Sequence, residues 1–161
     1  MTEPLAIRLA VFDCDGTLVD SQHSIVAAMH AACAVHRLDE PPAEQVRRVV
    51  GLELLEAIRV LLPASAEDML SRVHASYIAA YRDLRAQGLV RDLLYPGARE
   101  TIEYLEQSGW VLGVATGKSH RGLVATLDRH AMTSRFVTLQ TADRAAGKPN
   151  PEMLHKAMAE A

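Results

Sequence analysis

A short apolar run near the start of the chain stops at two carboxylates. The run, AIRLAVF, covers residues 6–12, and Asp13, Asp15 and Gly16 follow it. A short, apolar and partly β-branched segment of this kind is typical of a strand buried in a parallel sheet. Because open α/β sheets bind ligands at the carboxyl ends of their strands, the two aspartates stand where a functional site is expected.

Residues 18–92 show the apolar periodicity of helices. Apolar side chains recur at steps of three and four residues in four successive stretches, each closed by proline or glycine. This spacing predicts a bundle of helices, each with one apolar face. We expect the fourth helix to begin at a Ser65 cap. Its apolar stripe should form core packing, and the stripe consists of Met69, Val73, Tyr77, Tyr81 and Leu84.

Beyond Gly97, strand and helix patterns alternate. Two apolar segments, WVLGVA and RFVTLQ, are typical of strands, and amphipathic segments of helical period lie next to them. Such alternation predicts a parallel sheet joined by right-handed crossovers. We therefore expect an α/β protein in which residues 1–17 and 93–161 form the core and residues 18–92 form an inserted all-helical cap.

The composition argues against several classes of protein. With 161 residues, 49% hydrophobic and 23% charged, the chain can bury a core. A net charge of −3 with scattered basic residues predicts no nucleic-acid partner and no membrane surface. We find no secretory signal and no membrane-spanning stretch. Cys14 and Cys33 are expected to be buried free thiols, as in a reducing cytoplasm.

Polar residues follow each predicted strand. Asp13 and Asp15 follow the first strand, Thr116, Gly117 and Lys118 stand at the end of the second, and the loop after the third holds Asp143 and Lys148. The sequence leaves Lys118 open between a surface charge and a ligand contact, and Asp143 is interpreted as a turn residue. In a parallel sheet the carboxyl ends of the strands share one edge. We therefore expect these residues, which are far apart in the sequence, to converge there.

Three interpretations of the paired aspartates compete: a calcium-binding loop, an ordinary acidic turn and a phosphate-handling active site. A calcium-binding hand requires glycine at its sixth position and glutamate at its twelfth. Counted from Asp13, glycine falls at the fourth position and Ser24 at the twelfth, which excludes that site. A phosphoryl-transfer site fits better, because one carboxylate can attack phosphorus while a second moves protons. Thr116 and Lys148 would then hold the phosphate oxygens, and Mg²⁺ would offset the charge.

Three segments, DCDGTLVDS, VATGK and GKPNPE, resemble in order the first three motifs of the haloacid dehalogenase (HAD) superfamily. With its helical insertion after the first motif, the chain is similar to the branch that contains phosphoglycolate phosphatase and β-phosphoglucomutase. The resemblance implies a Rossmann-like parallel sheet core and a helical cap. It also implies a cytoplasmic hydrolase that cleaves a small-metabolite phosphomonoester through an aspartyl-phosphate, with Mg²⁺.

The resemblance implies a role for each matching residue. Asp13 would be the nucleophile and Asp15 the general acid and base. Thr116 would bind the phosphate through its hydroxyl, with Gly117 beside it as a further substrate contact. Lys148 would steady both the nucleophile and the phosphate.

The family's metal site includes residues that the chain does not show. In the family, Mg²⁺ is held by the carboxylate that corresponds to Asp13, the main-chain carbonyl that corresponds to Asp15, and an acidic pair from a fourth motif. No fourth motif occurs before Ala161. We therefore expect a HAD core that is incomplete at its C-terminus, in a fragment of a longer protein. If the chain ends there, weak Mg²⁺ binding and little activity are expected.

Alternatives remain open at this point. Arg47, on the second cap helix, is a candidate for recognising an anionic substrate. The function could instead be that of a β-phosphoglucomutase-like phosphomutase, or of a catalytically weak phosphate-binding or phospho-accepting module. The expected partner is a small phosphorylated metabolite, and the residues do not indicate an oligomeric state.

Overall fold

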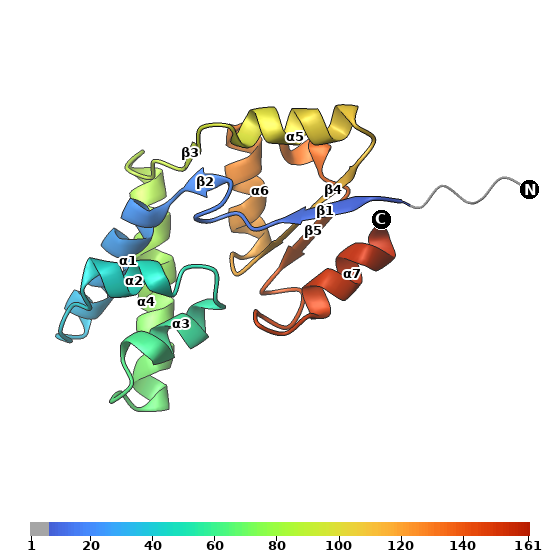
Figure 1. The fold of residues 1–161 in the computed structure, drawn as a ribbon. Coiled ribbons are helices and arrows are strands. Elements are labelled where there is room, and N and C mark those ends of the chain that lie inside the picture. Colours follow the sequence, from blue (N-terminus) through green and yellow to red (C-terminus); the bar gives the residue numbers. More distant parts are fainter. Residues whose placement is uncertain (1–6) are drawn as a thin grey trace, which may run out of the picture.

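A three-stranded parallel sheet lies at the centre of the larger part of the molecule (Figure 1). The computed structural model describes residues 7–161. β4 lies between β1 and β5, and the three strands run parallel, which confirms the α/β prediction. Residue 6 of the predicted first strand, and residues 1–5 before it, lie outside the described residues. The strands are β1 (Leu9–Phe12), β4 (Val111–Thr116) and β5 (Thr138–Thr141).

Helices cover both faces of this sheet. α5 and α6 lie on one face and α7 on the other (Figure 1). Leu112 and Val114 of β4 pack with Ile102 of α5 and with Leu123 and Leu127 of α6 in one apolar cluster. Burial on both faces is expected for the central strand of a parallel sheet. The helices are α5 (Ala98–Gln107), α6 (His120–Arg129), α7 (Glu152–Glu160) and the short 3₁₀ turn η1 (Thr133–Arg135).

Four helices form a bundle beside the sheet. They share an apolar core that includes Met29, Ile58 and Val73. Cys33 is buried in this core, and Cys14 is buried in the core beneath the sheet, both as free thiols, as predicted. The bundle is the helical cap expected from the sequence. Its helices are α1 (Gln22–Val35), α2 (Ala43–Arg48), α3 (Leu54–Leu61) and α4 (Glu67–Ala86).

The start of α4 differs from the prediction. The helix begins at Glu67, and Ser65 does not cap it. The Ser65 N–H instead donates to the Leu62 carbonyl at 3.0 Å, in the turn that follows α3. Glu67 and Asp68 bring negative charge to the first turn of α4, where the helix dipole favours it. No side-chain hydrogen bond caps α4, so the predicted Ser65 cap is wrong.

Two short strands connect the cap to the sheet. The chain leaves the core through β2 (Val19–Asp20) and returns through β3 (Leu93–Leu94). The two strands pair antiparallel, with Val19 opposite Leu94, between the bundle and the sheet (Figure 1). A strand of two residues is too short to show an alternating pattern, so the sequence did not predict this pair.

Candidate active site

The turn after β1 presents two carboxylates at the edge of the sheet. Asp13 directly follows the strand, and Gly16 has a φ of +83°, a left-handed conformation that costs glycine little. The Cys14 carbonyl accepts a hydrogen bond from the Leu18 N–H at 2.9 Å. The turn is therefore tight. Because the chain bends at Gly16, Asp13 and Asp15 both stay at the end of the strand.

Asp13 and Lys148 form an ion pair. Lys148 Nζ lies 3.1 Å from Asp13 Oδ1, and the Cys14 N–H donates to the same oxygen at 2.8 Å. Among residues 7–161, no hydrogen bond or ion pair involves Asp13 Oδ2. One carboxylate oxygen is thus held in position, and the other is open to a ligand.

Asp15 is held by Lys118 and Ser21. Lys118 Nζ lies 2.7 Å from Oδ1 and 2.9 Å from Oδ2, and the Ser21 hydroxyl donates to Oδ1 at 2.6 Å. Burial by itself lowers the pKa of Lys118, but the adjacent Asp15 carboxylate outweighs burial, so the pKa is raised. The sequence left Lys118 open between a surface charge and a ligand contact. Ser21 directly precedes α1, but its hydroxyl donates to Asp15 and does not cap the helix.

Thr116 ends β4 beside the end of β1. The two strands are parallel neighbours, so their carboxyl ends lie at the same edge of the sheet. Thr116 is 1% exposed, and its Oγ1 accepts the Lys118 N–H at 3.2 Å. A hydroxyl that accepts one hydrogen bond can still donate its own proton. The structure therefore brings Asp13, Asp15, Thr116 and Lys148 to one edge of the sheet.

A loop of the cap lies directly on the core at this edge. Residues 51–53 connect α2 to α3, and they approach two glycines of the core. A Cβ atom on Gly117 would lie 2.3 Å from the Leu52 carbonyl oxygen, and one on Gly147 would lie 2.6 Å from Glu53 Cβ. Any larger residue at these two positions would collide with the loop. The two glycines allow the cap to close on the core, a role that the sequence pattern did not reveal.

The same loop passes near the open oxygen of Asp13. A Cβ atom added at Gly51 would lie 3.5 Å from Asp13 Oδ2, which is ordinary van der Waals contact. Because glycine has no such atom, the space beside this oxygen is free of a Gly51 side chain.

A cavity of about 530 Å³ lies between the cap and the core. On the core side its lining includes Asp15, Thr116 and Lys118, and on the cap side it includes Tyr77 and Tyr81 of α4. The cavity thus reaches Asp15, Thr116 and Lys118 at the sheet edge, whereas Asp13 and Lys148 are not among the described residues that line it. It is the space in which a substrate could contact both parts of the molecule.

The apolar stripe of α4 contributes both to the core of the cap and to the lining of the cavity. Met69 and Val73 pack in the core of the cap, as predicted for the whole stripe. Tyr77 and Tyr81 also line the cavity, and their ring centroids are 6.0 Å apart. The prediction of core packing was therefore incomplete, because helical period cannot distinguish a side chain that faces a core from one that faces a cavity.

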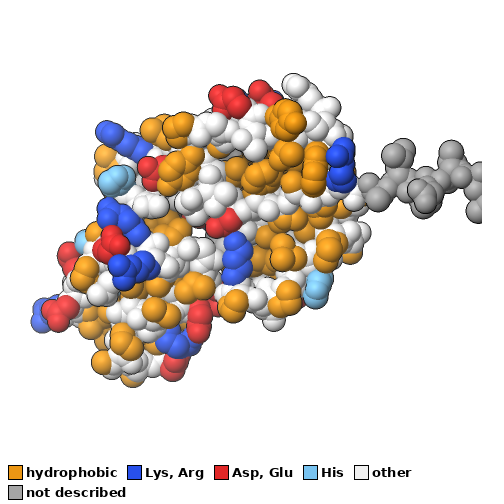
Figure 2. All heavy atoms as spheres, in the orientation of Figure 1, with side chains coloured by type: hydrophobic (Ala, Val, Ile, Leu, Met, Phe, Trp, Pro, Cys, Tyr) orange, Lys and Arg blue, Asp and Glu red, His pale blue; other side chains and the backbone are white. Residues whose placement is uncertain are grey.

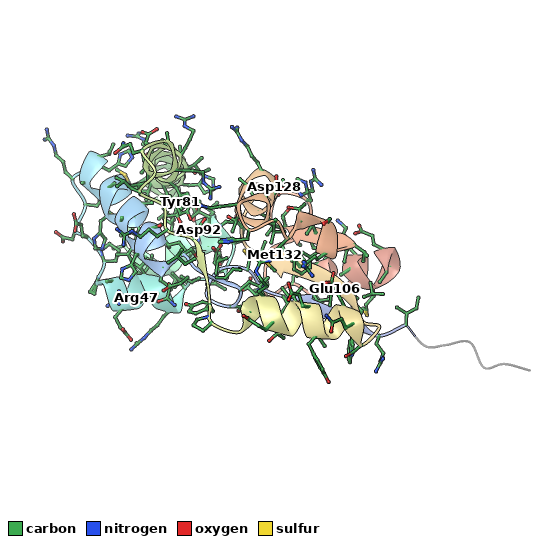
Figure 3. The ribbon with its side chains drawn as sticks, turned by 90° about the horizontal axis from the view of Figure 1, so that it is seen from above. Arg47, Tyr81, Asp92, Glu106, Asp128 and Met132 are labelled. Carbon is green, nitrogen blue, oxygen red and sulfur yellow. The ribbon has the colours of Figure 1, made fainter. Side chains whose placement is uncertain are left out.

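Arg47 and Asp143 lie in different surroundings. Arg47 is exposed on α2, and it is not among the described residues that line the cavity. In Figure 3 it lies apart from Tyr81, which does line the cavity. Asp143 lines the cavity and accepts hydrogen bonds from Thr141 Oγ1 at 2.6 Å and the His120 N–H at 2.9 Å. Burial raises the pKa of Asp143, but these hydrogen bonds outweigh it, so the pKa is lowered. The structure thus separates Arg47 from the other candidates.

A buried acid links the cap to the core. Asp92 is 2% exposed, and its carboxylate accepts hydrogen bonds from the Tyr81 hydroxyl, from Arg85 and from the Thr126 hydroxyl, each at 3.2 Å. Tyr81 and Arg85 belong to α4 of the cap, and Thr126 belongs to α6 of the core. Figure 3 shows Tyr81 and Asp92 close together. Sequence reasoning missed Asp92, because it follows no predicted strand and belongs to no motif.

The described residues supply part of a magnesium site. No group of three or more His, Cys, Asp or Glu side chains in residues 7–161 is arranged to hold a metal ion. The donors at the sheet edge are the Asp13 carboxylate and the Asp15 carbonyl, which accepts no backbone hydrogen bond from this part of the chain. Mg²⁺ commonly binds one or two carboxylates and keeps several waters. The donor set therefore fits Mg²⁺ chemically, although it does not fill an octahedral shell.

Charged side chains of both signs are scattered over the face of the molecule in Figure 2. Figure 2 shows acidic and basic side chains interspersed over the cap. No helix in residues 7–161 has the length and apolar character needed to cross a bilayer.

Comparison with known proteins identifies the family. The model of the haloacid dehalogenase-like hydrolase family matches residues 10–161. The chain belongs to the haloacid dehalogenase-like hydrolase family. This membership confirms the resemblance that the three sequence motifs indicated.

Curated members of the family are similar over most of this chain. Probable phosphatase IndB of Dickeya dadantii is 35% identical over 152 residues, which cover 90% of this chain and 64% of IndB. The phosphoglycolate phosphatase of Vibrio parahaemolyticus is 33% identical over 156 residues, which cover 92% of this chain and 68% of that protein. The chain therefore spans about two thirds of the length of these relatives.

Solved structures of the family share the fold. A protein of Bacteroides fragilis described as a haloacid dehalogenase-like hydrolase superposes with a TM-score of 0.84 at 22% identity, over 96% of this chain and 72% of that one. A hydrolase from Pseudomonas syringae gives 0.79 at 22% identity, over 96% and 70%. At these identities the likeness supports the fold alone, and it confirms the HAD core with a helical cap.

Proposed function

We propose that the protein is a phosphatase that hydrolyses a phosphomonoester of a small metabolite, with Asp13 as the nucleophile. The observation that carries this proposal is the Asp13–Lys148 ion pair at 3.1 Å, beside the end of β4 where Thr116 stands. A lysine in this position offsets the repulsion between a carboxylate and a phosphate. Membership of the hydrolase family and the phosphatase names of the relatives support the same reaction class.

The first half of the reaction forms an aspartyl-phosphate. Asp13 Oδ2 attacks phosphorus, the bond between phosphorus and the ester oxygen breaks, and Asp15 gives a proton to the leaving alcohol. The Thr116 hydroxyl and Lys148 bind the remaining phosphate oxygens. This step needs a protonated Asp15, so the contact between Lys118 and Asp15 must open before it. An anionic substrate would compete for Lys118 and so open that contact.

The second half of the reaction releases phosphate. Asp15, now a carboxylate, takes a proton from water, and the water attacks phosphorus and frees Asp13. The Ser21 hydroxyl donates to Asp15 Oδ1 at 2.6 Å and so orients the carboxylate. An oriented base lowers the barrier because less freedom is lost in the transition state.

Mg²⁺ is the metal that we assign to this site. The Asp13 carboxylate and the Asp15 main-chain carbonyl are the groups of this chain that would hold it. When bound, the ion supplies positive charge that stabilises the transferring phosphoryl group.

Movement of the cap gives the substrate access. The loop of residues 51–53 lies against Gly117 and Gly147, at the same edge of the sheet as Asp13. We infer that it lifts to admit the phosphate and then excludes bulk water during the reaction. Exclusion of water strengthens the charge interactions in the site.

Replacing the nucleophile tests the proposal. Asp13→Asn should lower kcat for a generic aryl phosphate, such as 4-nitrophenyl phosphate, by at least about a thousandfold. Asp83→Asn, which changes an exposed carboxylate on α4, is the matched control and should keep the wild-type rate. In the wild-type protein, brief incubation with substrate followed by acid quenching should trap phosphate on Asp13. Activity that survives in Asp13→Asn would contradict the assignment. The relatives' names make phosphoglycolate the first natural substrate to assay.

A further inference from the structure

We propose that Glu152 of α7 is a positioning residue for Lys148: it holds the loop before α7 so that the lysine ammonium reaches Asp13. Lys156, one turn further along α7, holds both Glu152 and the same loop. The proposal rests on the proposed function for the role of Lys148. It adds two residues that lie outside the ion pair between Lys148 and Asp13.

The loop that carries Lys148 is fixed by backbone hydrogen bonds only near its two ends. Residues 142–151 connect β5 to α7 (Figure 1). Two N–H groups at the start of the loop donate to the Thr141 carbonyl, at 2.9 and 3.1 Å, and one N–H near its end donates to the Gly147 carbonyl at 3.0 Å. In the part of the chain that the structure describes, the Ala146 N–H donates to no backbone carbonyl. Ala146 lies two residues before Lys148, so the segment that leads into the lysine needs another support.

Glu152 supplies this support. Its Oε2 accepts the Ala146 N–H at 2.9 Å, and its Oε1 lies 2.7 Å from Lys156 Nζ. Each carboxylate oxygen therefore has its own partner, which fixes the orientation of the side chain. Lys156 first, and then the Ala146 N–H, lower the pKa of Glu152, so the carboxylate stays charged at neutral pH. Hydrogen bonds to a charged acceptor are stronger than those between neutral groups.

Lys156 adds a second contact to the same loop. Its Nζ donates to the Arg144 carbonyl at 2.8 Å. Glu152 and Lys156 are four residues apart on α7, so they lie on one face of the helix. Met153 and Ala157, which alternate with them along α7, are buried and anchor the helix on the sheet. An anchored helix thus grips the loop at two points on the N-terminal side of Lys148.

The cap restricts the same segment. Gly147 lies between Ala146 and Lys148, and a Cβ atom at Gly147 would lie 2.6 Å from Glu53 Cβ in the cap loop. The segment therefore has little room to shift toward the cap. Glu152 holds it from the core, so the position of the Lys148 backbone is set by contacts with both parts of the molecule.

A fixed backbone matters to Lys148 because its side chain is long and flexible. In the structure Lys148 Nζ lies 3.1 Å from Asp13 Oδ1. Each backbone torsion that becomes free adds conformations in which the ammonium does not reach Asp13. Loss of the Glu152 contact should therefore lower the fraction of molecules that form the ion pair, although no group is removed from the site itself.

Hydrogen exchange at a single amide tests the contact without any activity. In Glu152→Ala the Ala146 N–H loses its acceptor, and we expect its exchange, followed by NMR, to become at least about tenfold faster. Glu152→Gln keeps an oxygen that can accept this bond and should exchange more slowly than Glu152→Ala. Wild-type exchange of Ala146 in Glu152→Ala would overturn the proposal.

The reactivity of Lys148 tests the consequence for the ion pair. A trace of acetic anhydride labels lysines, and mass spectrometry measures the labelled fraction at each one. Labelling of Lys148 requires its pair with Asp13 to open, so Glu152→Ala should raise the rate at least about threefold. Lys118, whose pair with Asp15 is untouched, is the internal reference. An unchanged ratio of Lys148 to Lys118 labelling would overturn the proposal.

A double-mutant cycle shows whether Glu152 acts through Lys148. Glu152→Ala should lower kcat/KM for 4-nitrophenyl phosphate about tenfold, and Glu152→Gln should restore part of the loss. In a Lys148→Ala background, Glu152→Ala should cause no further loss, because the residue that it positions is absent. The same fold loss in both backgrounds would indicate a merely structural role and would overturn the proposal.

Glu44 offers a matched control for these measurements. It also lies in the first turn of a helix, α2, and pairs with a basic residue four positions on, Arg48. Glu44→Ala should leave kcat/KM, Ala146 exchange and Lys148 labelling at their wild-type values, and losses equal to those of Glu152→Ala would overturn the proposal. If the wild-type protein hydrolyses no phosphate ester, the proposed function fails, while exchange and labelling still decide whether Glu152 positions Lys148.

Discussion

Lys118 Nζ lies within 2.9 Å of both carboxylate oxygens of Asp15, so one lysine holds the whole acid. The pair joins the loop after β4 to the loop after β1, and the two side chains are 10% and 11% exposed. Water screens such a pair weakly, and loss of one partner leaves the other charge buried. The pair therefore contributes to the stability of the sheet edge as well as to the position of Asp15.

Removal of the lysine should destabilise the protein. We expect Lys118→Met to lower the free energy of unfolding by about 3 kcal/mol, because the buried Asp15 carboxyl group loses its cation. Urea denaturation at pH 7 measures this loss. Lys156→Met breaks the exposed pair with Glu152 and should cost less than about 1 kcal/mol. Adding Asp15→Asn to Lys118→Met should recover part of the loss, and similar losses in the two lysine variants would count against this account.

A methyl group at Gly117 should prevent the cap loop from reaching the core. In Gly117→Ala the new Cβ would lie 2.3 Å from the Leu52 carbonyl oxygen, so the loop must shift away. We expect faster amide hydrogen exchange in residues 51–53, with wild-type exchange in α5, which lies elsewhere. Phosphatase activity should fall at least about tenfold, because the cap then closes poorly over the substrate. Unchanged exchange in residues 51–53 would show that the loop does not need the glycine.

Loss of the Asp92 charge should loosen the cap from the core. Asp92→Asn keeps the size of the side chain but removes the carboxylate that accepts from Tyr81, Arg85 and Thr126. We expect the free energy of unfolding to fall by about 2–4 kcal/mol and hydrogen exchange to increase in α4. Asp68→Asn, at an exposed pair on the same helix, is the control and should have little effect. Equal exchange in the two variants would contradict the proposed link.

Alkaline pH should weaken the contact between Tyr81 and Asp92. Burial first, and then the nearby Asp92 and Asp15 carboxylates, raise the pKa of Tyr81 to about 12. In the unfolded chain a tyrosine ionises near pH 10. The stabilising contribution of the neutral Tyr81 is therefore complete below about pH 10, and it is lost as the pH rises toward 12. Urea unfolding at pH 9 and pH 11 should show a smaller drop in stability for Tyr81→Phe than for the wild type, and equal drops would contradict this assignment.

The strands of the sheet could be predicted because their signals are local. The apolar run that ends at Phe12 and the one that ends at Ala115 both become strands, and Gly109, which follows α5, has a φ of +75°. Each of these patterns depends on backbone geometry and on burial within a few neighbouring residues. The convergence of Asp13 and Lys148 followed from the parallel sheet, because parallel strands end at one edge.

The contacts between distant segments could not be predicted in this way. The sequence did not decide whether Lys118 is a surface charge or a ligand contact. It predicted that Ser65 caps α4, but no side chain caps this helix in the structure. Asp92 had no motif at all, although it is among the most buried acids of the described chain. In each case the partner lies in another loop or helix, and local periodicity carries no information about that partner.

The sequence by itself determined the order of the helices and of the three strands of the parallel sheet, the two carboxylates after β1 and the family, because apolar period, glycine positions and motif spacing are properties of short segments. Only the tertiary structure decided that Lys118 holds Asp15 from 103 residues away and that residues 51–53 lie on Gly117. It also decided that Tyr77 and Tyr81 line a cavity. The physical reason is that these contacts depend on how the cap packs on the core, and that packing is set by the summed burial of many side chains rather than by any one segment.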